Sequence, residues 1–226
     1  MHRLFDEFID PVFTKYRPKR LLEIGVLHGK NTYNILKWCD REGATLTSLD
    51  PVDWIGELPD DVREGMESYK YKRGQEHFDN WQIKPEGLEA VFAEGLQRHW
   101  SCLKMRSLDY FVSPQVESFD AYLVDGDHNY FTVITELLLI HRYAKKNTLI
   151  VLHDVAKTTN ARKDEYYDPT FIPADQIDGP KQGILTAIED FLAMVGGRGF
   201  GNRFFAQYEF DILTSREDGL GLLIRR

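Results

Sequence analysis

The sequence predicts one α/β domain over residues 1–226, built on a seven-stranded, mostly parallel sheet with helices on both faces and a C-terminal antiparallel hairpin. From about residue 20, short apolar runs alternate with helical segments, a pattern typical of parallel sheets covered on both sides. The last two apolar runs instead follow one another across a polar turn, which predicts the hairpin. A chain of 226 residues suits one such domain.

Seven segments are expected as strands because each is a short apolar run that ends at a turn or at polar residues. These segments are residues 20–25, 44–50, 102–106, 119–125, 148–152, 204–212 and 219–225. Helices are expected over residues 30–40, 60–73, 84–98, 130–143 and 181–195. In the first of these helices, Ile35, Leu36 and Trp38 would form the buried side.

Two segments interrupt the alternation of strands and helices. Residues 51–100 are long for a single strand-to-strand connection and are interpreted as a helical insertion inside the domain. Residues 155–180 are polar and rich in proline, which predicts a long loop. Loops of this length in compact domains are usually functional or disordered, so we expect this one to close over an active site.

Composition excludes several classes of protein. Formal net charge is -8, from 36 acidic and 28 basic side chains, and no basic stripe of the kind that binds nucleic acid is evident. The two cysteines, Cys39 and Cys102, lack the spacing of a zinc site or a disulfide framework. No signal peptide or stretch of ~20 apolar residues occurs. We expect a cytoplasmic protein without nucleic-acid or membrane partners. Composition leaves open whether the chain forms a homo-oligomer.

The first expected strand runs into a glycine-containing turn, Glu23-Ile24-Gly25-Val26-Leu27-His28-Gly29. Glycine permits a sharp turn and a close approach of backbone to a ligand, and the following helix presents free N–H groups. The pattern is E-x-G-x-x-x-G, which matches neither the dinucleotide fingerprint nor the phosphate-binding loop. An ordinary strand-to-helix turn is the alternative interpretation. Asp50 ends the second strand, where an acid can bind ribose hydroxyls or merely stabilise a turn.

A second group of polar residues follows the fourth and fifth expected strands. Asp125 and His128 come after one strand, and His153 and Asp154 end the other. If these strands are neighbours, the four side chains converge on the crevice of the glycine turn. Carboxylates suit Mg²⁺ or Mn²⁺, and imidazoles extend the choice toward Fe, Zn or Ni. Taken singly, each residue could be no more than a helix cap or a packing residue.

The glycine pattern resembles motif I of class I S-adenosylmethionine-dependent methyltransferases, which have a Rossmann-like fold. This resemblance implies that Glu23 helps to hold the amino group of the cofactor and that backbone at Gly25 and Gly29 passes beside its methionine part. Asp50 would bind the ribose. The resemblance also places Ser107 and Asp109 near the adenine and includes Asp125 among the cofactor-binding residues.

The stretch FDAYLVDGDHNYFTVITELLLIHRYAKKNTLIVLHDV resembles the metal-dependent O-methyltransferase branch of that class, which includes macrolide-sugar, rhamnosyl and cephalosporin-hydroxylase-like enzymes. The resemblance implies that Asp125 and Asp154 bind a divalent metal, with Mg²⁺ preferred. His153 occupies a ligand position where the relatives usually carry an acid. His128 matches the catalytic base, and imidazole has an ordinary pKa of ~6.5 that suits proton transfer near neutral pH.

These observations predict an enzyme that methylates a hydroxyl of a small molecule or sugar, using S-adenosylmethionine with help from a metal. A second hypothesis is a metal-dependent hydrolase or non-haem iron oxygenase, because His128, His153 and one carboxylate could form a two-histidine, one-carboxylate set. A third is a binding module without chemistry. The second polar group argues against a pure binding module, since such a module would have no need of it.

Overall fold

The structure is a computed structural model that describes residues 1–51, 86–156, 161–165, 172–177, 179–195, 207–216 and 219–226. The strands are β1 Arg20–Ile24, β2 Thr45–Asp50, β3 Trp100–Lys104, β4 Ala121–Val124, β5 Leu149–His153, β6 Tyr208–Thr214 and β7 Leu220–Arg225. The helices are η1 His2–Leu4, η2 Phe5–Ile9, α1 Asp10–Tyr16, α2 Lys30–Glu42, α4 Glu86–Ala93, η4 Leu96–His99, α5 Ser107–Val112, α6 Tyr130–Tyr143 and α7 Ile184–Met194.

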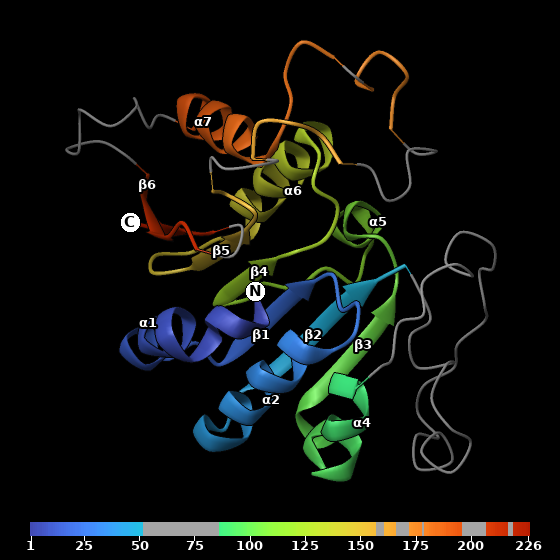
Figure 1. Cartoon of the computed structure of the whole chain (residues 1–226), viewed down its shortest axis with the longest axis vertical. Coiled ribbons are helices and arrows are strands. Elements are labelled where there is room, and N and C mark those ends of the chain that lie inside the picture. Colours follow the sequence, from blue (N-terminus) through green and yellow to red (C-terminus); the bar gives the residue numbers. More distant parts are fainter. Residues whose placement is uncertain (52–85, 157–160, 166–171, 178, 196–206, 217–218) are drawn as a thin grey trace.

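The strands form one sheet in the order β3-β2-β1-β4-β5-β7-β6 (Figure 1). Strands β1 to β5 pair in parallel, whereas β7 pairs antiparallel with both β5 and β6. The predicted seven-stranded sheet with its C-terminal hairpin is therefore confirmed. Strand order reverses between β1 and β4, which creates a crevice at the carboxyl ends of these two strands.

Side chains of successive strand residues point to opposite faces of the sheet, so the core consists of two layers. On one face Leu21 packs with α1, α2 and α4, and on the other Leu22 and Ile24 pack with α5, α6 and α7. Figure 1 shows these two sets of helices on opposite sides of the sheet. Ile35, Leu36 and Trp38 are buried against the first face, as predicted.

Several boundaries differ from the sequence-based expectation. Strand β3 begins at Trp100 instead of residue 102, because the register of its pairing with β2 starts there. The helix expected over 84–98 divides into α4 and η4 at Gly95, whose φ of 66° lies in the left-handed region. Helix α5 and the helical N-terminal segment were not predicted. The expected helix 60–73 and residues 204–206 of the sixth expected strand lie outside the described residues.

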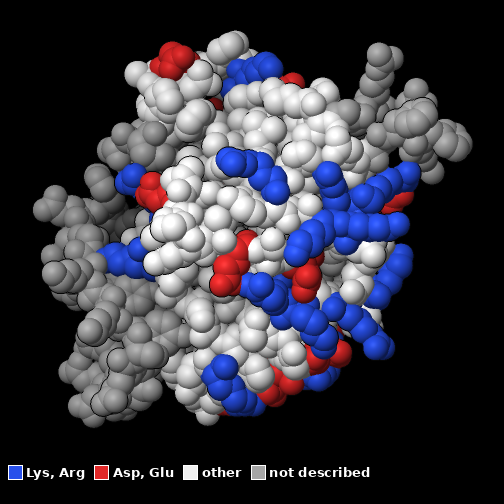
Figure 2. Space-filling model, turned by 180° about the vertical axis from the view of Figure 1, so that it is seen from behind, with Lys and Arg blue, Asp and Glu red and all other residues white. Residues whose placement is uncertain are grey.

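Charged side chains are unevenly distributed over the surface. Figure 2 shows one face on which Lys and Arg gather with fewer Asp and Glu among them, although the whole chain carries a formal charge of -8. Exposed ion pairs such as Arg41–Asp10 and Arg162–Glu189 neutralise part of the basic side chains. Within the described ranges, none of the helices has the length and apolar character that crossing a bilayer requires.

Candidate active site

The glycine turn after β1 lies directly against the end of β4. Gly25 has a φ of +91°, and a Cβ atom there would stand 2.3 Å from the carbonyl oxygen of Asp125. Only glycine permits both this backbone conformation and this approach. The N–H of Asp125 donates to the carbonyl of Ile24 at 3.0 Å, which fixes the two strand ends together. The turn and Asp125 consequently share one wall of the crevice.

Asp50 holds the glycine turn from the neighbouring strand. Its Oδ2 atom accepts hydrogen bonds from the backbone N–H groups of Val26 at 2.8 Å and Leu27 at 3.3 Å. The residue is 6% exposed at the end of β2. Asp50 is thus a structural clamp on the turn, and its expected contact with a ribose stays a prediction.

Gly29 faces a helix instead of the crevice. A Cβ atom on Gly29 would lie 2.5 Å from Cδ2 of Leu88, and a Cβ atom on Gly87 would lie 2.2 Å from the carbonyl carbon of Gly29. The N–H of Gly87 donates to the carbonyl of His28 at 3.1 Å. The two glycines therefore let the start of α4 pack directly on the turn. Sequence reasoning assigned no role to Gly87.

Glu23 is fully buried beneath the turn. Its carboxylate accepts hydrogen bonds from Ser48 at 2.7 Å, Thr32 at 2.8 Å and Asn31 at 3.0 Å. Burial raises the pKa of Glu23 to about 7 in spite of these three hydrogen bonds, and the charge of Asp125 adds to the rise. Of this group, Asn31 lines the crevice, so Asn31 stands between Glu23 and the space that a ligand would occupy.

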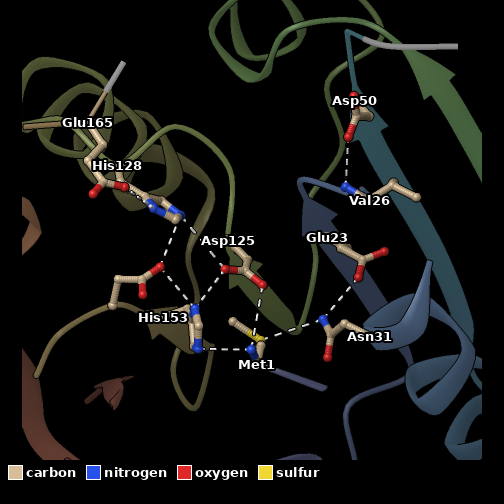
Figure 3. Close-up of polar contacts among 10 residues, drawn as sticks. Met1, Glu23, Val26, Asn31, Asp50, Asp125, His128, His153 and Glu165 are labelled. Carbon is tan, nitrogen blue, oxygen red and sulfur yellow. Dashed lines mark hydrogen bonds and ion pairs between the residues drawn. The ribbon is translucent and has the colours of Figure 1, made fainter. Parts of the chain in front are cut away.

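Four predicted residues converge at the ends of β4 and β5 (Figure 3). The Nδ1 atom of His153 lies 3.0 Å from Oδ1 of Asp125 and 2.9 Å from Oδ2 of Asp154. The Nε2 atom of His128 lies 3.1 Å from the same Asp154 oxygen and 3.9 Å from Oδ1 of Asp125. Asp154 has a φ of +58°, a conformation that aspartate tolerates better than most residues and that turns its carboxylate toward His128.

His128 reaches this cluster from an extended segment. Helix α6 begins only at Tyr130, after Asn129, whose side chain accepts a 2.8 Å hydrogen bond from the N–H of Thr132 as the N-cap. No helical turn therefore joins Asp125 to His128. Ligand atoms of Asp125, His128 and Asp154 all lie within 4.8 Å of one another. In the predicted metal set, Asp125, His153 and Asp154, the Nδ1 atom of His153 lies 3.0 Å and 2.9 Å from one oxygen of each carboxylate, but this set is not the group whose ligand atoms are mutually close.

The charges in the cluster compensate one another. Burial lowers the pKa of His153, but hydrogen bonds to Asp125 and Asp154 outweigh it and raise that pKa to about 9. Burial opposes the ionisation of Asp154, yet the hydrogen bond from His153 lowers its pKa overall. The α-amino nitrogen of Met1 lies 2.8 Å from Nε2 of His153. Below the raised pKa of His153 both Nε2 and an ammonium group carry protons, so the two nitrogens can share a hydrogen bond only when one of them is uncharged. The two carboxylates thus attract cations on both sides.

The segment between β5 and α7 contributes one acid to the site. The N–H of Glu165 donates to the carbonyl of His128 at 3.1 Å, and Oε2 of Glu165 lies 3.9 Å from Nδ1 of His128. Asp164 beside it accepts 2.7 Å hydrogen bonds from the N–H groups of Tyr130 and Gly183. Residues 161–165 are therefore bound to the starts of α6 and α7. Closure of the expected loop 155–180 over an acceptor stays a prediction.

Ser107 and Asp109 lie on α5, which follows β3 at one edge of the sheet. The hydroxyl of Ser107 donates to Oε1 of the buried Glu136, and Asp109 is exposed. Neither residue lines the pocket formed by the glycine turn and the acid–histidine cluster. Their expected contact with adenine is untested.

One pocket of about 470 Å³ joins the glycine turn to the acid–histidine cluster. It is lined by Met1, His2, Arg3, Gly25, Val26, Leu27, His28, Lys30, Asn31, Asp125, His128, His153, Asp154, Ala156 and Glu165. Sequence reasoning missed the contribution of residues 1–3 and of Glu165. Nothing in the local pattern of these residues signals a role, because they reach the pocket only through tertiary packing.

Comparison with known proteins places these features in one family. A family model described as a methyltransferase domain matches residues 22–155, which include the glycine turn, both polar strand ends and most of the sheet. Among curated proteins, no match to the chain is found.

Several solved structures share the fold at low sequence identity. One of them is the O-methyltransferase TomG from Streptomyces achromogenes, which is involved in tomaymycin synthesis and was solved in complex with S-adenosylmethionine. TomG is 14% identical to this chain, with a TM-score of 0.55, and the match covers 95% of this chain and 76% of TomG. An O-methyltransferase from Bacillus cereus with S-adenosylhomocysteine is 14% identical with a TM-score of 0.52, over 96% and 79%. A protein from Klebsiella pneumoniae assigned as an O-methyltransferase is 17% identical with a TM-score of 0.56, over 96% and 78%.

Proposed function

The chain belongs to the methyltransferase-domain family that matches residues 22–155, and on that premise we propose that it transfers a methyl group from S-adenosylmethionine to a hydroxyl of a small molecule or sugar. The observation that carries the proposal is the convergence of Asp125, His128, His153 and Asp154 beside the Gly25 turn in one pocket. The ligands bound to TomG and to the Bacillus cereus enzyme, which share this fold, support the choice of donor.

The donor site would begin at the glycine turn. Gly25 lets the turn pack against the carbonyl of Asp125, and α2 directs the positive end of its dipole toward the turn from which it starts. Asp50 keeps the turn in shape through Val26 and Leu27. Because the sulfonium carbon of the donor is already electrophilic, the protein mainly has to align it with an oxygen and remove a proton.

Proton removal is assigned to His128. Its Nε2 atom lies 3.1 Å from Oδ2 of Asp154, so the carboxylate can orient the ring and stabilise the imidazolium that forms. Glu165 stands on the Nδ1 side at 3.9 Å. An acceptor hydroxyl in the pocket would transfer its proton to this imidazole as its oxygen bonds to the methyl carbon, the sulfur–methyl bond breaks and S-adenosylhomocysteine leaves.

A divalent metal fits the donor set of the cluster. Two carboxylates and an imidazole suit Mg²⁺ or Mn²⁺, and Asp125 with Asp154 attracts cationic groups from two directions. We assign Asp125, His153 and Asp154 as ligands and His128 as base. Bound there, the metal would lower the pKa of a coordinated hydroxyl. In the alternative arrangement, His128 would bind the metal with Asp125 and Asp154, and His153 would act as the base. The mutual distances of the ligand atoms of Asp125, His128 and Asp154 support this arrangement.

Calorimetry and an isotope assay test the function. The full chain should bind S-adenosylhomocysteine, and labelled methyl from S-adenosylmethionine should appear on one member of a panel of hydroxylated small molecules and sugars when Mg²⁺ is present. The proposal fails if neither S-adenosyl compound binds while a nicotinamide or nucleoside triphosphate does. Oxidation of the same panel with Fe(II) and O₂, without methyl transfer, would support the oxygenase hypothesis instead.

A further inference from the structure

Glu165 is an acid in the pocket to which the proposed chemistry assigns no role. It ends the described segment 161–165 after β5, and its side chain is 45% exposed. Its Oε2 atom lies 3.9 Å from Nδ1 of His128, whereas Nε2 of the same ring lies 3.1 Å from Oδ2 of Asp154. Figure 3 shows Glu165 and Asp125 on opposite sides of the ring. The imidazole of His128 therefore has a carboxylate near each of its two nitrogens.

The backbone holds Glu165 opposite His128. The two residues form an isolated antiparallel bridge, in which the N–H of Glu165 donates to the carbonyl of His128 at 3.1 Å. Side chains of directly opposed residues in such a pair project to the same side, with their Cβ atoms ~5 Å apart. Main-chain geometry thus keeps the Glu165 carboxylate beside this ring.

The segment that carries Glu165 is anchored near both of its ends. The carbonyl of Ala161 accepts a 2.8 Å hydrogen bond from the N–H of Leu185, and Asp164 accepts one at 2.7 Å from the N–H of Gly183. Gly183 has a φ of +83°, and a Cβ atom there would lie 2.4 Å from the carbonyl oxygen of Ala161, so this contact requires glycine. None of these anchors involves the Glu165 side chain, so that side chain can be changed while the anchors remain.

A neutral imidazole offers different groups at its two nitrogens, because one carries the proton and the other a lone pair. A base or a metal ligand must present the lone pair. At His128 the nitrogen that faces the cluster is Nε2, so the proton has to reside on Nδ1. Asp154 at 3.1 Å favours a proton on Nε2 instead, and this preference is lost once Asp154 serves as a metal ligand. An acid on the Nδ1 side favours the required tautomer, as where a carboxylate orients a catalytic or metal-binding histidine.

We propose that Glu165 is a positioning residue for His128, whose carboxylate accepts the Nδ1 proton and leaves the Nε2 lone pair directed at the cluster. The separation of 3.9 Å is an ion-pair distance, and rotation of the exposed Glu165 side chain shortens it to the ~2.9 Å of a hydrogen bond. The inference rests on the proposed function. It holds in both arrangements given above, because His128 needs the same lone pair as a base and as a metal ligand. As a base, Nε2 takes the acceptor proton, and the carboxylate of Glu165 stabilises the resulting imidazolium.

Nuclear magnetic resonance of the full chain with ¹⁵N-labelled histidine tests the tautomer directly. Protonated and lone-pair ring nitrogens have different chemical shifts, and comparison with His128→Ala assigns the signals of His128. The spectra are recorded without ligand at alkaline pH, where the ring is neutral. Glu165→Ala should shift the ratio of the two tautomers toward the Nε2–H form by roughly 3- to 10-fold, the equivalent of one ordinary hydrogen bond. Glu165→Gln keeps an oxygen that can accept the Nδ1 proton and should retain most of the original ratio.

Turnover of the acceptor found in the isotope assay gives a second readout. Glu165→Ala should lower kcat by about 10- to 100-fold, the usual effect of losing a carboxylate behind a functional histidine, and should leave affinity for S-adenosylhomocysteine nearly unchanged. Glu165→Gln should recover part of this loss. The matched control is Glu189→Ala, which removes the 2.7 Å ion pair between Glu189 and Arg162 of the same segment without touching His128. It should keep both the tautomer ratio and kcat.

Two results would overturn the inference while leaving methyl transfer intact. One is a tautomer ratio in Glu165→Ala equal to that of the unaltered protein. The other is an equal loss of kcat in Glu165→Ala and Glu189→Ala, which would assign the effect to loosening of the segment. Failure of the unaltered protein to bind any S-adenosyl compound would instead overturn the proposed function, and the tautomer ratio would still decide whether Glu165 orients His128.

Discussion

Gly87 packs on Gly29 so closely that a Cβ atom on Gly87 would stand 2.2 Å from the carbonyl carbon of Gly29. Gly87→Ala must therefore displace either α4 or the glycine turn. We expect a loss of about 1–3 kcal/mol in the free energy of unfolding and a parallel loss of affinity for S-adenosylhomocysteine. Denaturant unfolding and calorimetry would measure the two effects. Glu89→Ala, an exposed change on the same helix, should stay within about 0.5 kcal/mol; equal behaviour of the two variants would contradict the contact.

His128→Ala tests the catalytic base. Turnover should fall by about 10²–10⁴-fold, the usual contribution of a positioned base, while affinity for S-adenosylhomocysteine stays nearly unchanged. His99→Ala, in η4 beside Asp40, is the matched control and should keep full turnover. Near-normal rates for His128→Ala across pH 6–9 would transfer the role to His153 or to water.

Removal of the cluster carboxylates tests metal dependence. Asp125→Ala and Asp154→Ala should abolish activity and leave donor affinity largely intact, because the metal would face the acceptor. Titration of Mn²⁺ into His153→Ala and His128→Ala should show the larger loss of metal affinity for His153→Ala under the assigned ligand set. The opposite order would exchange the two imidazoles. Activity that survives exhaustive chelation would rule out a metal in the reaction.

We expect Asp164 to hold the segment that carries Glu165 in place, through its hydrogen bonds to backbone N–H groups of α6 and of the residue before α7. Asp164→Ala leaves the N–H groups of Tyr130 and Gly183 without their acceptor, which should lower the free energy of unfolding by about 1–3 kcal/mol. The segment that carries Glu165 would loosen beside His128, so kcat should fall more than donor affinity. Asp164→Asn keeps an acceptor oxygen and should recover most of both losses. Identical kcat values for the Ala and Asn variants would show that this clamp does not position the base.

Glu23 should make the stability of the ligand-free protein depend on pH. Its pKa of about 7 lies above the ordinary 4.5, so the folded state favours the protonated carboxyl. The stabilisation is complete below pH 4.5 and is lost as the pH rises through 7. As the pH rises through this window, the unaltered protein loses free energy of unfolding and the uncharged Glu23→Gln variant does not. The free energy of unfolding of the variant should therefore rise by roughly 3 kcal/mol relative to that of the unaltered protein. Urea unfolding at pH 5 and pH 8 measures this, with Glu89→Gln as a control; a difference that does not vary with pH would refute it.

The alternation of strands and helices, the C-terminal hairpin and the two polar strand ends could be predicted from the sequence. Each is a local pattern, and in a parallel sheet the carboxyl ends of neighbouring strands meet at one edge, so Asp125 and His153 had to approach one another. The same reasoning placed Gly25 at the crevice, because a glycine between a strand and a helix usually serves a close approach.

Only the tertiary structure decided what surrounds these residues. Gly29 turned out to accommodate Leu88 and Gly87 of α4, a contact between residues nearly 60 positions apart. Met1 and Glu165 reach the pocket through packing of the N-terminal segment and of the loop after β5, which no periodicity encodes. In the sequence, Glu136 is a polar residue within the largely apolar helix α6. Its burial against Ser107 depends on the packing of α6 on α5, which the local sequence does not indicate. Local sequence determines where each strand ends, whereas long-range contacts determine what meets there.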